Sequence, residues 1–213
     1  MNPLLFPVKL YGDLYAWPKR RRVIARALSP MLRGFSRILD IGCGDGLLCR
    51  DLAACLPPGV VLHGVDVLRN LSPPIPYVVY DGLHLPFSDG AYEASLLVDV
   101  LHHSRDPDGL LREAARVSHG CVIVKDHDYR GRVDFALMKA GDYLGNKMFG
   151  IDLPYNFRTW RAFETMFGEA GLEIAAYEDS LKPAGRLELH HHFVVKLTRR
   201  TPDDRRSRKG DAA

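Results

Sequence analysis

Four aspartates in this chain of 213 residues stand at or near the ends of short apolar runs. Asp40 lies within RILDI, and the other three end their runs: Asp66 in VVLHGVD, Asp81 in YVVYD and Asp99 in EASLLVD. An ionised carboxylate only accepts hydrogen bonds, so it suits the hydroxyl and amine groups of a ligand. Like charges gathered at one edge of a sheet raise one another's energy unless a ligand or a donor separates them. The pattern therefore predicts a ligand that carries hydroxyls, amines or a positive charge.

A glycine-rich loop follows the first of these acids. Gly42, Gly44 and Gly46 alternate with other residues, which resembles the start of the GxGxxG fingerprint that binds a dinucleotide pyrophosphate. Leu47 stands where the third fingerprint glycine is expected, and Asp45 adds a negative charge beside the place of a pyrophosphate. Both features disfavour an NAD-linked oxidoreductase. The loop suits a ligand whose backbone-facing part is neutral or zwitterionic.

Histidines supply the candidates for acid–base chemistry. His127 follows Asp126 at the end of an apolar run, and a histidine titrates near neutral pH when its pKa is unperturbed. His127 is therefore a candidate general base, although a role as a polar turn residue is equally open. The His102–His103 pair fits either a position near a ligand or packing at a helix start. Residues 190–192 alternate faces of an expected strand, so we interpret them as surface and edge residues, with no metal expected.

Strands and helices are expected to alternate along the chain. The apolar runs predict strands at 37–41, 60–66, 77–81, 93–99, 121–126, 172–178 and 191–197. Helical spacing predicts helices at 18–33, 47–56, 107–117 and 159–171, the last two with Asp106 and Thr159 as N-caps. Such alternation is typical of a mostly parallel α/β sheet covered on both faces, which binds ligands at the carboxyl ends of its strands.

Composition limits the class of protein. A hydrophobic content of 46% supports a packed core, and a net charge of +3 is too small to argue for a nucleic-acid partner. The four cysteines form no CxxC pair, which favours reduced thiols and a cytoplasmic protein. No apolar run approaches the roughly 20 residues that span a bilayer. The basic residues 19–22 leave peripheral contact with an anionic membrane open.

Three motifs together carry a family resemblance. LDIGCGDG, then GVD, then DGLHLPFSDGAYEASLLVDVLHH, within residues 37–127, resemble a class I S-adenosylmethionine-dependent methyltransferase of the ubiquinone- and menaquinone-biosynthesis-like type. The resemblance implies a Rossmann-like, doubly wound sheet of seven strands, mostly parallel, with the last strand antiparallel. It also implies S-adenosylmethionine as the cofactor.

The resemblance assigns roles to ten residues. The implied cofactor contacts are Asp40 near the amino-acid part, the backbone of Gly42, Cys43 and Gly44, Asp66 at the ribose, Val67 on the adenine, Asp81 and Gly82 at the adenine amine, and Asp99 and Val100 beside the methionine part.

The acceptor site is expected beyond the fifth strand. The resemblance places a substrate cover at 129–160, and apolar and polar side chains there suit a pocket for a small, apolar or lipid-like acceptor, methylated on oxygen or carbon. The wall and anchor candidates are Tyr129, Tyr143, Asn146, Phe149, Tyr155, Phe157 and Arg158. His127, with Asp126, is the expected catalytic group.

Two other functions stay open from the sequence. A nucleic-acid methyltransferase is disfavoured because the expected base-holding motif is absent after the fourth strand. The second open function is an interaction module that binds the cofactor but catalyses no methyl transfer. We divide the chain into a basic helix or lid at 1–34, a methyltransferase domain at 35–198 and a disordered tail at 199–213. The sequence does not indicate the oligomeric state.

Overall fold

A single mixed sheet organises the chain. The computed structural model describes residues 17–69, 74–146, 154–183 and 191–200, without the side chains of 141, 142 and 144–146. The sheet has seven strands in the order β3-β2-β1-β4-β5-β7-β6. Their bounds are β1 Arg37–Ile41, β2 Val61–Asp66, β3 Tyr77–Val79, β4 Tyr92–Val98, β5 Ser118–Asp128, β6 Leu172–Glu178 and β7 His191–Arg199.

The strand directions confirm the predicted fold class. β1 pairs in parallel with β2 and β4, β2 with β3, and β4 with β5. β7 is antiparallel to both β5 and β6. Parallel neighbours bring their carboxyl ends to one edge of the sheet, so β1, β2, β4 and β5 together define the edge where ligands of such folds bind.

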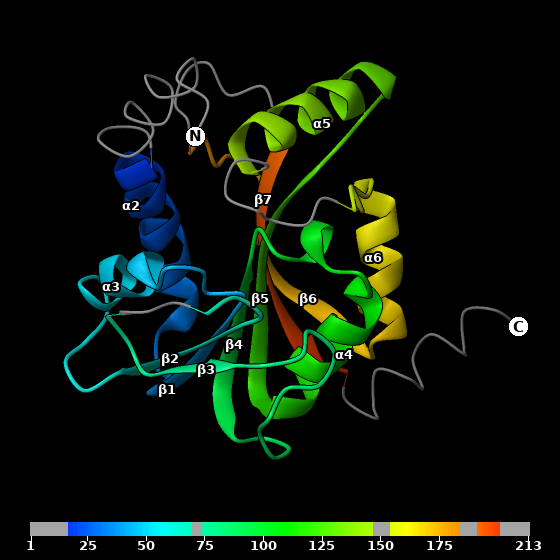
Figure 1. Cartoon of the computed structure of the whole chain (residues 1–213). Helices are drawn as coiled ribbons and strands as arrows, with labels where there is room; N and C mark the ends of the chain where they lie inside the picture. The colour runs from blue at the N-terminus through cyan, green and yellow to red at the C-terminus, as the bar shows by residue number, and fades with distance from the viewer. Residues whose placement is uncertain (1–16, 70–73, 147–153, 184–190, 201–213) are drawn as a thin grey trace, which may run out of the picture.

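Helices cover both faces of the sheet (Figure 1). Their bounds are α2 Trp17–Leu28, α3 Leu47–Ala53, α4 Pro107–Val117, α5 Arg132–Asn146 and α6 Trp160–Glu169, with short 3-10 turns at Ser29–Leu32 and Leu101–His103. α2 and α3 share one apolar core with the sheet, and α4 and α6 share the other. α5 lies beyond the edge of the sheet, where β5 ends (Figure 1).

Local sequence signals set several helix boundaries. Asp106 accepts a hydrogen bond from the Gly109 amide at 2.8 Å, and Thr159 accepts one from the Ala162 amide at 3.3 Å. Both predicted N-caps are therefore confirmed. The helix expected at 18–33 is α-helical only to Leu28 and then tightens into a 3-10 turn that contains Pro30. A proline donates no amide hydrogen, which favours such a change of winding.

The first described helix, α2, belongs to the core on one side. Ile24, Ala25 and Leu28 of α2 are buried, and Leu32 continues the same stripe. Hydrophobic burial of this face fixes α2 against α3 and the sheet, so its polar face is held in a defined direction. None of the described helices is long and apolar enough to cross a membrane.

Candidate functional site

The glycine loop after β1 is held tightly from two sides. Gly42 has φ 75° and Gly44 has φ 55°, which favour glycine. The Gly42 amide donates to the Val65 carbonyl at 2.7 Å, and a Cβ on Gly42 would lie 2.4 Å from a methyl carbon of Val100. The loop therefore contacts both β2 and the residue that follows Asp99.

Asp66 lies directly beside this loop. Its Oδ2 accepts the Gly44 amide at 2.8 Å and its Oδ1 accepts the Leu68 amide at 2.9 Å. Each carboxylate oxygen has two acceptor positions, so one remains on each oxygen. Two adjacent acceptors of this kind match the two hydroxyls of a ribose, which donate, and this pair of acceptors therefore fits an adenosyl cofactor.

Two residues expected at the adenine lie together. Val67 is 53% exposed, directly after Asp66. Gly82 has φ 85°, and a Cβ there would lie 3.1 Å from a methyl carbon of Val67. The structure therefore brings an exposed apolar side chain and a bare backbone to one place, which is the combination that a flat aromatic ligand can cover.

Asp81 forms a local turn on the surface. Its Oδ1 accepts the amides of Leu83 and His84, each at 2.8 Å. These backbone hydrogen bonds lower the pKa of Asp81, so the exposed carboxylate stays ionised. Its second oxygen faces His84 at 3.5 Å.

Asp40 differs from the other acids because it lies inside the protein. Its side chain is buried, and its Oδ2 accepts the Cys49 thiol of α3 at 3.0 Å. Burial raises the pKa of Asp40 to about 7, against a smaller opposite effect of the thiol hydrogen bond. Asp40 thus connects β1 to α3 beneath the loop. Every one of the four acids has its own partner in the protein, so their repulsion alone does not require a ligand.

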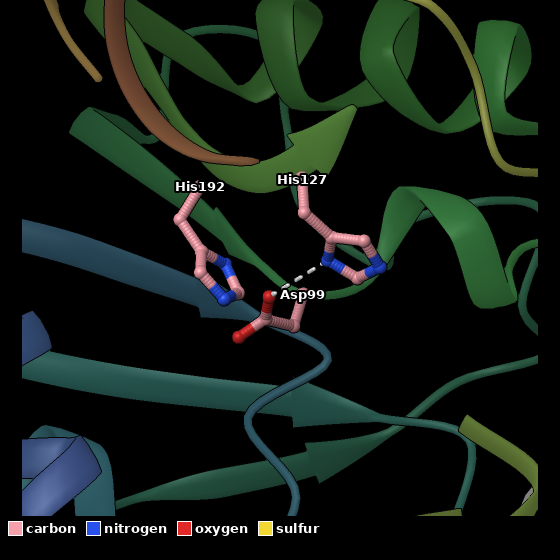
Figure 2. Close-up of side chains that lie close together, drawn as sticks. All are labelled: Asp99, His127 and His192. Atoms are coloured by element: carbon pink, nitrogen blue, oxygen red, sulfur yellow. Dashed lines mark ion pairs between the residues drawn. The ribbon is translucent and has the colours of Figure 1, made fainter. Parts of the chain in front are cut away.

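A charged network lies where β4, β5 and β7 meet, and Figure 2 shows three of its members, Asp99, His127 and His192. Lys125 is fully buried, and its ammonium lies 2.5 Å from Asp99 Oδ1 and 3.0 Å from His192 Nδ1. Arg20 of α2 donates to the other oxygen of Asp99 at 2.8 Å. Although burial opposes ionisation, Arg20 and Lys125 hold the pKa of Asp99 well below its usual range. Asp99 also has φ 55°, a conformation that is uncommon for a residue other than glycine.

His127 faces the same network with one ring nitrogen. Its Nδ1 lies 3.4 Å from Asp126 Oδ1 and 3.7 Å from Asp99 Oδ1, and its Nε2 points away from Asp99 (Figure 2). Burial, together with His102, lowers the pKa of His127 to about 3, despite the opposing carboxylates. His127 is therefore neutral at physiological pH. Asp126 is fully buried, and its Oδ1 lies 2.6 Å from Nδ1 of His102.

Aromatic side chains adjoin His127. Phe157 is buried, and its ring centroid lies 5.5 Å from those of both His102 and His127. Further rings extend from Phe157 at centroid distances of 5.9 Å to Phe135 and 6.1 Å to Tyr155. This group of rings, hereafter the aromatic wall, consists of Phe135, Tyr155 and Phe157, and Tyr129 contacts Phe135 from outside.

The remaining acceptor candidates whose side chains the structure describes, Tyr143 and Arg158, do not join the aromatic wall. Tyr143 is 53% exposed on α5. The side chain of Asn146 and the whole of Phe149 lie outside the described residues. Arg158 instead forms an ion pair with Asp108 in the first turn of α4, at 2.6 Å. Arg158 therefore connects the segment before α6 to α4 in this structure.

An open cleft lies beside this site but not at its centre. Its volume is about 410 Å³, and it is lined by Asp128, Tyr129, Arg130, Thr159, Trp160, Arg161 and Tyr177. His127 is not among these residues. The cleft therefore extends the acceptor side of the molecule around Tyr129, while the histidines lie deeper.

One expectation about the histidines was wrong. His192 is 5% exposed and accepts a hydrogen bond from Lys125, so it is neither a surface nor an edge residue. β7 lies between β5 and β6, and this central position buries it. Sequence reasoning also missed Arg20 and Lys125. The available signal for Lys125 was the presence of a lysine in the apolar run before Asp126.

The network raises the question of a metal ion. The ligand atoms of Asp99, His127 and His192 lie within 4.8 Å of one another. The Lys125 ammonium, however, already contacts Asp99 and His192. A buried ammonium beside these two ligand atoms occupies the position of a cation, so a second one would meet strong repulsion.

Comparisons with known proteins identify the family. The family described as "Methyltransferase domain" matches residues 16–177. Ajmaline N-methyltransferase of Rauvolfia serpentina is 28% identical over 176 residues, which are 75% of this chain and 60% of that protein. The chain thus spans less than two thirds of this relative's length.

Solved structures share the fold. A methyltransferase from Thermotoga maritima, described as a possible histamine N-methyltransferase, has a TM-score of 0.62 at 16% identity, over 92% of this chain and 96% of its own. NcsB1 is an O-methyltransferase from neocarzinostatin biosynthesis, solved with S-adenosylmethionine and 2-hydroxy-5-methyl naphthoic acid. It has a TM-score of 0.55 at 18% identity, over 84% of this chain and 56% of its own. The chain belongs to the class I S-adenosylmethionine-dependent methyltransferases.

Proposed function

We propose that this chain, as a member of the class I S-adenosylmethionine-dependent methyltransferases, transfers a methyl group to a small, largely apolar acceptor, on oxygen or carbon. The observation that carries the proposal is the position of His127. Its Nδ1 faces two carboxylates, its Nε2 points away from Asp99, and the aromatic wall adjoins its ring. The arrangement suits a proton acceptor beside an apolar acceptor molecule.

The cofactor would lie along the glycine loop. Asp66 would accept from the ribose hydroxyls, Val67 and Gly82 would cover the adenine, and Asp81 would accept from the adenine amine. Asp99 and Val100 would stand beside the methionine part, as would the backbone of Gly42, Cys43 and Gly44. When bound, S-adenosylmethionine supplies an electrophilic methyl group on a sulfonium. Asp40 acts indirectly, because its carboxyl is buried against Cys49.

His127 would take the proton of an acceptor hydroxyl at Nε2. The proton would leave as the oxygen accepts the methyl group that bound S-adenosylmethionine supplies, with the electron pair of the carbon–sulfur bond remaining on sulfur, because a histidine with a pKa of about 3 is too weak a base to remove the proton beforehand. The imidazolium that forms has Nδ1 close to Asp99 and Asp126, which stabilise its charge. The ion pair of Asp126 with His102 keeps this carboxylate in place.

Two observations support a small acceptor. Ajmaline N-methyltransferase is named for a small molecule, and NcsB1, which shares the fold, was solved with a naphthoic acid. The aromatic wall, with Tyr129 and the adjoining cleft, offers this chain an apolar surface with polar groups at its margin. Tyr143, Asn146, Phe149 and Arg158 stay as acceptor candidates, although Arg158 would first have to leave Asp108.

The basic run at residues 19–22 is only partly available for contact with a membrane. Arg20 and Arg21 of the basic run form ion pairs with Asp99 and Asp51 within the protein. Their charges are therefore directed inward and are less available to a lipid surface. A lipid-like acceptor would still bring the enzyme to a bilayer, so an acceptor screen should include vesicles with anionic lipids.

The test is methyl transfer from S-adenosylmethionine labelled in its methyl group. The full chain is incubated with small phenols, aromatic acids, amines and lipid vesicles, and labelled product is measured with the wild type and His127→Gln. We expect the substitution to slow transfer to a hydroxyl by about 10²- to 10⁴-fold, with unchanged affinity for the cofactor. Equal rates for both proteins across pH 6–9 would remove His127 as the base.

A further inference from the structure

The helix α5, which lies beyond the edge of the sheet, turns an apolar face outward (Figure 1). Val133 is 72% exposed and Leu137 is 43% exposed, and Ala136 and Ala140 are exposed as well. The spacings of three and four residues place these four side chains on one side of the helix. We call the four residues the α5 stripe.

The opposite side of α5 packs against the protein. Met138 is buried, and the ring of Phe135 lies 5.9 Å from that of Phe157, between centroids, in the aromatic wall. A surface helix usually has one apolar face toward the core and a polar face toward water, whereas α5 is apolar on both. An exposed apolar face of this kind marks a binding surface.

Basic side chains border the α5 stripe. Arg132 and Lys139 are exposed and seven residues apart, so they lie along one flank of the helix. The acid of the first turn, Asp134, accepts the Arg130 amide at 3.2 Å. Residues 130–147 contain four basic and two acidic residues, so the segment carries an excess of positive charge. Its charge is complementary to an anionic surface.

The size of the α5 stripe favours a lipid bilayer over a second protein. A helix of 15 residues is about 22 Å long and about 10 Å wide, so one face offers on the order of 200 Å². A stable protein–protein interface buries about 800 Å² on each partner. A bilayer sets no such requirement, because a helix with an apolar face and flanking basic side chains inserts that face at the boundary of headgroups and acyl chains.

We infer that the α5 stripe binds the surface of an anionic lipid bilayer, with Arg132 and Lys139 at the lipid headgroups. Tyr143 is 53% exposed on the same flank, and tyrosine rings are enriched at the headgroup level of membranes. The inference goes beyond methyl transfer and does not depend on it. One consequence does rest on the proposed function: because Phe135 belongs to the aromatic wall, the bilayer would adjoin the acceptor side.

The experiment measures binding of the full chain to sedimented vesicles, without cofactor or acceptor. The vesicles consist of phosphatidylcholine alone or of an equal mixture with phosphatidylglycerol. The test variant carries Val133→Ser and Leu137→Ser. Its matched control carries Val61→Ser and Ile174→Ser, at positions that are 43% and 40% exposed on β2 and β6.

A second pair of variants tests the charge. Arg132→Gln removes one cation from the flank of the α5 stripe, and Arg112→Gln removes an exposed cation from α4 as its control. Circular dichroism of each variant checks the fold. If the double variant fails to fold, this second pair and the two vesicle types decide the inference.

We expect the wild type to bind the anionic vesicles about 10- to 100-fold more tightly than the neutral ones, because each basic side chain near the surface contributes roughly fivefold. Loss of Val133 and Leu137 should weaken binding to the anionic vesicles by about 10- to 100-fold, because less apolar surface leaves water. Arg132→Gln should weaken it about fivefold. Both controls should bind like the wild type.

Four results would overturn the inference. The wild type binds neither kind of vesicle, or it binds both equally well. The double variant binds as tightly as its control, or Arg132→Gln binds as tightly as Arg112→Gln. Sedimentation equilibrium adds a fifth: a wild-type dimer that the double variant cannot form would assign the α5 stripe to a second copy of the chain. None of these results bears on the methyl-transfer assay, so the two proposals fail separately.

Discussion

The two halves of the proposed site hold their acids by different means. On the side of β1 to β3, Asp66 and Asp81 accept backbone amides from residues close in sequence or from the glycine loop. On the side of β4, β5 and β7, Asp99 is paired with the side chains of Lys125 and Arg20, from distant parts of the chain.

The difference has a physical consequence. Acids that accept backbone amides depend on local turns, so a change in a distant side chain leaves them in place. Asp99 is paired with two side-chain cations, and removal of Asp99 leaves the fully buried Lys125 ammonium without its carboxylate partner. We therefore expect the second half to determine stability and the first half to determine affinity for the adenosine part.

The largest effect should follow from the loss of Asp99. Asp99→Ala leaves the buried Lys125 without a carboxylate, and we expect the free energy of unfolding to fall by about 3–5 kcal/mol in urea titrations at pH 7. The double substitution of Asp99→Leu with Lys125→Met should recover much of this loss, because it removes both charges. Asp81→Ala is the control in the other half, and a loss as large as that of Asp99→Ala would end the distinction between the halves.

A smaller effect should appear in the pH dependence of stability. The pKa of Asp40 is about 7 in the folded protein against an ordinary value of 3.8. Between these values the unfolded chain loses the proton while the folded protein keeps it, so stability falls as pH rises from about 4 to 7. Relative to Asp40→Asn, which cannot ionise, wild type should lose about 2–4 kcal/mol over this range.

Thermal or urea unfolding at several pH values measures this difference. Parallel curves for wild type and Asp40→Asn would show that the folded Asp40 titrates normally. The same curves with Cys49→Ala test the thiol. The hydrogen bond from the Cys49 thiol lowers the pKa of Asp40. Loss of the thiol should therefore move the pH range in which stability falls to higher pH.

The smallest effect concerns the first half itself. Asp66→Ala should weaken binding of S-adenosylhomocysteine by about 1–3 kcal/mol, because ribose hydroxyls lose their acceptor. Asp81→Ala should weaken it less, because that carboxylate is exposed. Calorimetric titration measures both. Unchanged affinity in both variants would remove the adenosine assignment from this half of the site.

Much of the fold followed from local sequence patterns. Apolar runs located all seven strands, and the side chains of Asp106 and Thr159 marked two helix starts. These features depend on residues that are neighbours in the chain. The α-helix at 132–146 was not predicted, since the segment was interpreted only as a substrate cover.

The sequence by itself determined the family, the mostly parallel seven-stranded sheet implied by it and the acids that follow the strands, because each depends on short contiguous motifs. Only the tertiary structure decided which of the basic residues 19–22 reaches Asp99, and that Lys125 and His192 are buried. The pairing of β7 with β5 and the packing of α2 on the sheet make these contacts. These contacts join residues that are far apart in the chain, so no local sequence pattern can predict them.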